Sequence, residues 1–251
     1  MASLLSRMLR PHKNRVQRRL ARVCERLHGR CVYSQDGEDL LVNRLLAMPP
    51  GTPGFYVDVG AHDPERLSNT FFFYLRGWRG INVDAMPGSM DAFRQMRPRD
   101  INVERAISDV RQTLTYYTFS EPALNGFNAE LSKERDGQNE WSRLLGTREI
   151  ETVTLAEVLD EHLPPGQQID FLSVDVEGLD YQVLKSNNWA KYRPRLVLAE
   201  DLGLRSLDQP GESQVYRFMR EQNYRLEAKT AATMFFLCCD GGGDGTGGPQ
   251  T

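Results

Sequence analysis

The chain of 251 residues lacks the features that most directly mark a membrane, secreted or metal-thiolate protein. No apolar run approaches the roughly 18–20 residues that span a bilayer. No apolar segment followed by a small-residue cleavage site lies near the N-terminus. The four cysteines form no CxxC pair and have no metal-ligand spacing. We therefore expect a soluble protein of the reducing cytoplasm.

The glycine-rich loops that bind phosphates are also missing. No G-x-x-x-x-G-K-[ST] run occurs, which excludes a Walker loop. In the apolar run over 54–64, the turn has a single glycine, Gly60, followed by Ala61 and His62. A dinucleotide fold needs a second glycine so that its backbone can contact the pyrophosphate, which argues against a nicotinamide-dependent oxidoreductase. One glycine behind an acidic strand end suits a nucleoside ligand without phosphates, of which S-adenosylmethionine is the common example.

Charge is distributed unevenly along the chain. Residues 1–30 hold nine Lys and Arg against one acid, Glu25, so this segment is about +8 and the remainder about −11. We expect a basic N-terminal helical arm over 1–32, either solvated or packed on a partner, or in peripheral contact with an anionic membrane. The acidic body argues against nucleic acid as a partner, because phosphate neutralisation dominates such binding.

Residues 33–239 alternate short β-rich runs with helical patterns, which predicts an α/β domain with a parallel sheet. An additional strand is expected over 114–119. The polar segment 120–150 is predicted to be an irregular lid or acceptor loop, and the glycine-rich segment 240–251 a flexible tail. The predicted strands cover 55–59, 80–83, 101–103, 170–174, 195–198, 224–228 and 233–238, and the predicted helices 37–48, 69–76, 89–96, 155–161, 179–187 and 212–222.

Acidic residues follow most of the predicted strands. The carboxyl ends of parallel strands meet at one edge of the sheet, where ligands bind. Several like charges there are costly unless a cation lies among them, and a sulfonium cofactor, a divalent metal or a basic side chain would serve. Asp175, Glu200 and Asp201 offer an all-oxygen set suited to Mg²⁺. The strand-end acids are Asp58, Asp84, Asp175, Glu177, Glu200 and Asp201.

Two strand ends predict contacts with a nucleoside. Asp84 follows Gly60 by 24 residues, the spacing at which a carboxylate accepts hydrogen bonds from ribose hydroxyls. Ala106 and Ser108 end the third strand, where backbone and small polar groups would contact an adenine edge.

Several motifs, in order and spacing, resemble the FkbM family of S-adenosylmethionine-dependent methyltransferases. The resemblance covers roughly residues 33–202. It implies an α/β, Rossmann-like class I methyltransferase fold, with a seven-stranded, mostly parallel sheet, an antiparallel last strand and helices on both faces. It also implies O-methyl transfer to hydroxyls of saccharides or natural products. The matching runs are SQDGED (34–39), FYVDVGAHDP (55–64), SNT (68–70), GWRGINVD (77–84), IDFLSVDVEG (169–178) and VLKS (183–186).

By this resemblance, residues before the first strand fold over the cofactor, namely Gln35 and Glu38. The cofactor turn itself is Asp58, Gly60 and Ala61. From the residues alone, the segment from Ser34 to Glu38 is equally well explained as an N-terminal helix cap.

Methyl transfer to a hydroxyl needs a base for the departing proton. Asp175 is the first candidate; a metal held by Asp175 and Glu200 is the second, and His62 the third. We expect an S-adenosylmethionine-dependent methyltransferase acting on a small-molecule or glycan acceptor. The alternative is a methyltransferase-like module that binds cofactor or partner without catalysis.

Overall fold

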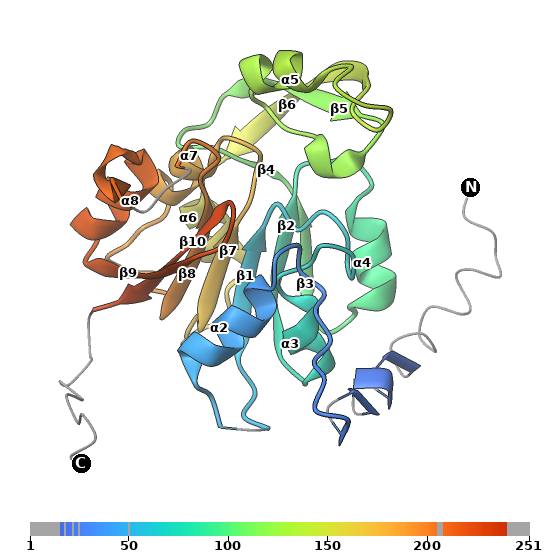
Figure 1. Ribbon diagram of the computed structural model, residues 1–251. Coiled ribbons are helices and arrows are strands. Elements are labelled where there is room, and N and C mark those ends of the chain that lie inside the picture. Colours follow the sequence, from blue (N-terminus) through green and yellow to red (C-terminus); the bar gives the residue numbers. More distant parts are fainter. Residues whose placement is uncertain are drawn as a thin grey trace.

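Seven strands of the computed structural model form one sheet (Figure 1). Its order is β3-β2-β1-β7-β8-β10-β9, and β10 alone runs in the direction opposite to the other six strands. The predicted seven-stranded, mostly parallel sheet with an antiparallel last strand is therefore confirmed. The bounds are β1 Phe55–Val59, β2 Arg79–Asp84, β3 Ile101–Glu104, β7 Phe171–Val174, β8 Leu196–Glu200, β9 Tyr224–Lys229 and β10 Thr233–Cys238.

The structure describes residues 16–17, 19–21, 23–24, 26–49, 51–204 and 208–239. The predicted basic arm over 1–32 is thus described only in part, and the predicted tail over 240–251 lies outside the described residues. Within the described ranges, no helix has the length and apolar character needed to cross a membrane.

Side chains of the central strands alternate between two apolar layers, as the pleat of a strand requires. On β1, Val57 packs in one layer and Tyr56 in the other. The layer of Val57 is covered by α6, α7 and α8, and that of Tyr56 by α2 and α3, so the prediction of helices on both faces is confirmed. The helices are α2 Glu38–Leu46, α3 Phe71–Leu75, α4 Met90–Met96, α6 Leu155–His162, α7 Asp180–Lys185 and α8 Gln214–Glu221.

The prediction that residues 120–150 are irregular is wrong. This segment contains a 3₁₀ turn η1 (Pro122–Leu124), the helix α5 (Ala129–Arg135) and the start of β6 (Leu144–Val153). Strand β6 lies between β4 (Ala106–Ile107) and β5 (Thr113–Phe119), the additional strand expected over 114–119, in a small second sheet beside the carboxyl ends of the large one. Most residues of β6 are exposed or half-buried, so its sequence carries many polar residues and lacks the apolar run of a core strand.

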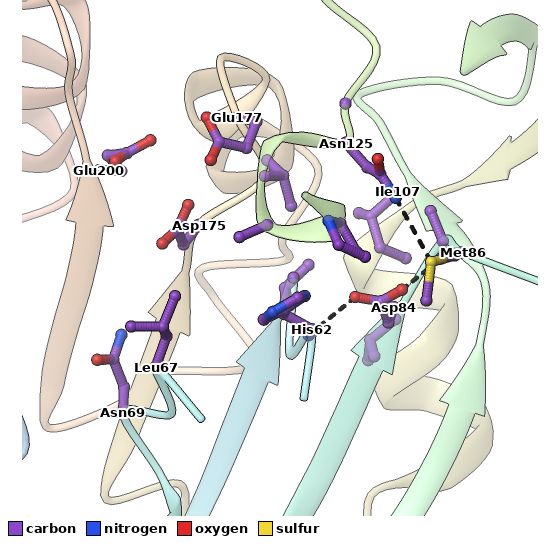
Figure 2. A pocket seen from close by; sticks show the side chains of 18 of the residues that line it. His62, Leu67, Asn69, Asp84, Met86, Ile107, Asn125, Asp175, Glu177 and Glu200 are labelled. Atoms are coloured by element: carbon purple, nitrogen blue, oxygen red, sulfur yellow. Dashed lines mark hydrogen bonds between the residues drawn. The ribbon is translucent and has the colours of Figure 1, made fainter. Parts of the chain in front are cut away.

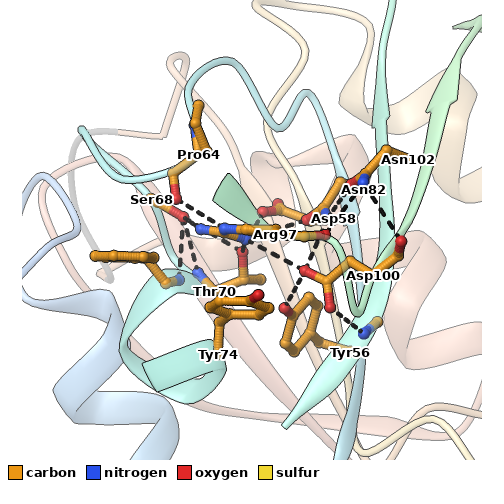
Figure 3. Close-up of polar contacts among 12 residues, drawn as sticks. Tyr56, Asp58, Pro64, Ser68, Thr70, Tyr74, Asn82, Arg97, Asp100 and Asn102 are labelled. Carbon is orange, nitrogen blue, oxygen red and sulfur yellow. Dashed lines mark hydrogen bonds and ion pairs between the residues drawn. The ribbon is translucent and has the colours of Figure 1, made fainter. Parts of the chain in front are cut away.

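A buried guanidinium joins the first three strands to the loop after β1 (Figure 3). Arg97, just after α4, is completely buried. Its Nε donates to the carbonyl oxygen of Pro64, and its two terminal nitrogens donate to Ser68 Oγ and Thr70 Oγ1, each at 2.7 Å. The same side chain lies over the ring of Phe71, 5.3 Å from the ring centroid. Arg97 thus fixes the segment from Pro64 to Phe71 against the sheet.

Two buried carboxylates complete this network. Thr70 Oγ1 donates to Asp58 Oδ2 at 2.7 Å, and the carboxylate of Asp100 lies 4.0 Å from the Arg97 guanidinium. Tyr56 donates its hydroxyl to Asp100 at 2.6 Å. Burial raises the pKa of both carboxyls, and the nearby guanidinium of Arg97 opposes that rise. Removing the cation would leave two buried acids without a compensating charge.

We predict that Arg97→Met lowers the free energy of unfolding by about 3–5 kcal/mol, the usual effect of breaking a buried ion pair. Urea denaturation measures this change. Arg94→Met is the matched control, because Arg94 lies on the same helix with a half-exposed side chain paired to Asp91. A destabilisation by Arg97→Met equal to that of the control would contradict the assigned role.

Candidate functional site

A cavity lies at the carboxyl ends of the strands, where the order of the sheet reverses between β1 and β7 (Figure 2). This is the switch point at which open α/β sheets bind ligands. Its walls come from the ends of β1, β2, β7 and β8, from the loop after β1, and from the segment between β5 and α5. The sequence-predicted residues that line it are Gln35, Glu38, Gly60, His62, Asp84, Asp175, Glu177 and Glu200.

Gly60 is required by the packing of β1 against β7. Its φ is +85°, and a Cβ at this position would lie 1.7 Å from the carbonyl oxygen of Asp175. The backbone N–H groups of Gly60 and Ala61 both donate to Val83 at the end of β2, at 2.9 and 3.1 Å. The single glycine of the turn therefore permits a close approach between two strand ends and brings Asp175 to the cavity wall.

Asp84 is held by two backbone donors. Its Oδ2 accepts the N–H of His62 at 2.9 Å, and its Oδ1 accepts the N–H of Met86 at 2.8 Å. Burial raises the pKa of the Asp84 carboxyl, and these two hydrogen bonds oppose the rise. A carboxylate offers about four acceptor sites, so these two backbone donors leave acceptor capacity for a ligand.

Three carboxylates meet on the opposite side of the cavity. Oxygens of Asp175, Glu177 and Glu200 lie within 4.8 Å of one another. Glu177 pairs with Arg135 of α5 at 2.6 Å, whereas Glu200 Oε2 has no hydrogen-bond partner among the described residues. Burial and repulsion from neighbouring acids raise the pKa of Asp175 well above its ordinary value, and that of Glu200 to about 10.

The segment before β1 closes one end of the cavity. Glu38 is buried, and its carboxylate accepts the hydroxyl of Thr230 and the backbone N–H of Asp36, each at 2.8 Å. Gln35 is exposed and lines the cavity. Asp39 exchanges hydrogen bonds with Ser34, so this segment both begins α2 and contributes to the cavity wall.

The segment between β5 and α5 covers the cavity from the other side. Gly126 and Phe127 line it, and the ring of Phe127 lies 4.9 Å from that of Tyr116 on β5. Arg66, in the loop after β1, donates two hydrogen bonds of 2.9 Å to Glu121 at the start of this cover. Arg66–Glu121 thus fixes the start of the cover, and Arg135–Glu177 fixes the helix α5 that follows it.

Several predicted site residues do not line this cavity. Asp58 belongs to the Arg97 network, and Ala61 packs in a small cluster with α4. Ala106, Ser108 and Asp201 do not line the cavity because successive side chains of an extended backbone face opposite sides. Arg105 and Ile107 face the cavity in place of Ala106 and Ser108, and Asp201 lines a separate cavity behind Glu200.

Sequence reasoning missed several functional positions. Arg135 was unassigned because it lies in the segment predicted as irregular, and Arg97 because its partners are distant in sequence. The sequence marks Glu177 as a strand-end acid, but the predicted set of oxygen ligands contains Asp201 and not Glu177. At Glu177 the backbone has a left-handed φ of +55°, and this turn directs the side chain towards the other two carboxylates. In the sequence, only the glycine that follows Glu177 indicates such a turn.

This arrangement suits a cationic ligand that carries hydroxyl groups. Six carboxylates line the cavity against one guanidinium, that of Arg105, among the described residues. A cation bound there would favour the ionised form of Asp175 and Glu200, whose pKa values are raised by burial and by neighbouring acids. The fixed carboxylate of Asp84 suits hydroxyl groups, and the crowded acids across the cavity suit proton transfer. The six are Asp36, Glu38, Asp84, Asp175, Glu177 and Glu200.

Comparison with known proteins yields one family. The family model for the methyltransferase FkbM domain matches residues 58–226. No curated protein sequence matches the chain. A TehB-like SAM-dependent methyltransferase from Corynebacterium glutamicum is similar in structure with a TM-score of 0.36 and 11% identity, over 91% of this chain and 99% of that one. That likeness is too weak to support a conclusion.

We predict that Glu200→Gln stabilises the protein at pH 8. The raised pKa means that the folded state holds a proton that the unfolded state releases near pH 4–5, so this carboxyl lowers stability as pH rises towards about 10. The melting temperature should increase by about 2–4 °C at pH 8, the shift expected for roughly 1 kcal/mol, and by less at pH 5. The control is Asp91→Asn on α4, where the carboxylate is mostly exposed. A lower melting temperature for Glu200→Gln at pH 8 would contradict this account.

Proposed function

Because the chain belongs to the FkbM family of S-adenosylmethionine-dependent methyltransferases, we propose that it methylates a hydroxyl group of a saccharide or a related hydroxylated metabolite. The observation that carries the proposal is the position of Asp175. It directly follows β7 at the switch point, lines the cavity, and has a carboxylate oxygen within 4.8 Å of those of two further acids.

The cavity fits the methyl donor in charge and in hydrogen-bonding groups. S-adenosylmethionine carries a sulfonium, an ammonium and a carboxylate, so its net charge of about +1 complements an acidic wall. Asp84 would accept hydrogen bonds from the two ribose hydroxyls. Gln35 and Glu38 would hold the methionine end, while Met86 and Ile107 would contact the adenine, in place of Ala106 and Ser108.

When bound, the donor supplies a methyl group that moves from sulfur to the attacking hydroxyl oxygen, while the electron pair of the broken C–S bond stays on sulfur. The protein supplies alignment and a base. Asp175 takes the hydroxyl proton, and its raised pKa strengthens it as a base once it is ionised. Below that pKa it holds a proton, so the rate should fall with decreasing pH. Glu200 orients the acceptor through its free oxygen.

A base is favoured here over a divalent metal. Asp175, Glu177 and Glu200 do offer the oxygen ligands that Mg²⁺ prefers. However, the guanidinium of Arg135 already supplies a positive charge to Glu177 at 2.6 Å. Asp201, the third ligand predicted from the sequence, is outside this set and accepts the backbone N–H groups of Gly203 and Leu204.

Replacing the base tests the reaction. We predict that Asp175→Asn lowers kcat at least 100-fold on any sugar that the wild type methylates, the loss typical of a general base. The Kd for S-adenosylhomocysteine should stay within threefold, which separates catalysis from binding. Asp109→Asn is the control, because this carboxylate pairs with Lys185 outside the cavity wall. A kcat within threefold of the wild type for Asp175→Asn would exclude it as the base.

Replacing the strand-end acid tests the cofactor site. We predict that Asp84→Ala weakens binding of S-adenosylhomocysteine more than tenfold in calorimetry, because hydrogen bonds to a charged group are lost. Glu104→Gln is the matched control: Glu104 pairs with Asp84 in register on β3, accepts a backbone N–H from Gly88 at 2.9 Å, and does not line the cavity. Unchanged affinity in Asp84→Ala would refute the ribose assignment.

A further inference from the structure

A second cavity adjoins the first behind Glu200. It has a volume of about 550 Å³, within the range of small-molecule sites. Its walls come from α5, from the turn between β7 and α7, from the end of β8 and from the start of α8. Glu200 lines both cavities, so a molecule bound in the second one lies next to the three-carboxylate cluster.

A close contact between the cover and the turn after β7 separates the two cavities. A Cβ on Gly126 would lie 3.0 Å from Cβ of Glu177, and a Cβ on Gly178 would lie 3.0 Å from Nδ2 of Asn128. Two glycines therefore allow the cover to contact the turn after β7, and the Arg135–Glu177 ion pair holds that contact. Glu177 lines the first cavity and Gly178 the second, so this contact lies between the two cavities.

The second cavity is acidic throughout its described lining. Its described lining contains the four acids Asp180, Glu200, Asp201 and Glu212, and no Lys, Arg or His. Burial raises the pKa of Asp180 to about 7, and burial with repulsion from Asp175 raises that of Glu200 to about 10, so Glu200 is protonated at neutral pH and the charge of the cavity comes from the other acids. Hydrogen bonds fix two of them: Asp180 accepts the N–H groups of Val176 and Gly178, and Asp201 accepts those of Gly203 and Leu204. A cavity lined by one sign of charge repels ligands of the same sign.

We propose that this second cavity binds the methyl acceptor and that it selects hydroxyl compounds without a negative charge. The inference rests on the proposed function, because the first cavity is then filled by the donor and the acceptor must approach the carboxylate cluster from another side. Glu200 lines both cavities, and its carboxylate has an oxygen within 4.8 Å of one of Asp175, so an acceptor in the second cavity would reach the base past Glu200. Sugar phosphates, nucleotide sugars and uronic acids would be excluded, whereas neutral and amino sugars would be accepted.

The test compares acceptors that share a pyranose ring and differ in charge. Gluco, galacto and manno pyranoses are each supplied as neutral methyl glycoside, 2-amino sugar and uronic acid, with radiolabelled S-adenosylmethionine and the full chain. We expect transfer to at least one neutral or amino sugar, at a rate at least tenfold above that of its uronic acid. Glu212→Lys should reduce this ratio at least threefold without changing the Kd for S-adenosylhomocysteine. The control is Glu161→Gln, an exposed acid on α6 outside both cavities, which should leave the ratio unchanged.

Each other result counts against the inference. Equal or faster transfer to uronic acids would overturn it, as would an unchanged ratio in Glu212→Lys. Cofactor binding without transfer to any sugar would overturn the saccharide-sized acceptor assigned to this cavity while leaving the cofactor site intact. Failure to bind S-adenosylhomocysteine would instead overturn the proposed function itself, and calorimetry distinguishes that case.

Discussion

The wall of the candidate site depends on one buried guanidinium. Arg97 binds the loop after β1 through Pro64 and Ser68, and from the same loop Asn69 reaches Ser173 on β7 with a 3.0 Å hydrogen bond. A buried ion pair by itself contributes little to stability, because desolvation offsets the Coulombic attraction. Its effect here is to give an irregular loop one conformation. That conformation places His62, Leu67 and Asn69 along the cavity, so the shape of the site follows from a network that does not touch a ligand.

The site itself is built at the expense of stability. Asp175, Glu177 and Glu200 are brought together at the ends of two adjacent strands, and among the described residues only Glu177 has a cation as partner. Their raised pKa values show that the folded chain keeps protons there that the unfolded chain would release. Functional sites commonly retain such destabilising groups because the ligand compensates for them. A sulfonium would do so in the first cavity, and the second, acidic cavity extends the same selection for positive or neutral ligands to the acceptor.

Local patterns were sufficient to predict the large sheet but not the small one. The buried strands are short apolar runs bounded by turns, and their carboxyl ends placed Asp84, Asp175 and Glu200 at the cavity as predicted. Strand β6 and helix α5 are missed because they are polar and only one residue of each is fully buried, so no apolar run marks them. Asp58 was assigned to the cofactor because its partner Arg97 lies far along the chain. Ala106 and Ser108 were predicted to contact the adenine, but they do not line the cavity. The direction in which side chains of the two-residue strand β4 point depends on its pairing with β6, which is distant in sequence, and no local pattern reveals that pairing.

We propose that the acid-lined cavity at the ends of β1, β2, β7 and β8 binds a cationic methyl donor. Calorimetric titration with S-adenosylmethionine and with S-adenosylhomocysteine, in buffers of different ionisation enthalpy, tests it most directly. The account predicts that both bind, and that S-adenosylmethionine releases more protons from the protein, because its sulfonium favours the ionised carboxylates. Failure of either S-adenosylmethionine or S-adenosylhomocysteine to bind would contradict the proposed cofactor site. Equal proton release on binding of the two compounds would contradict it as well.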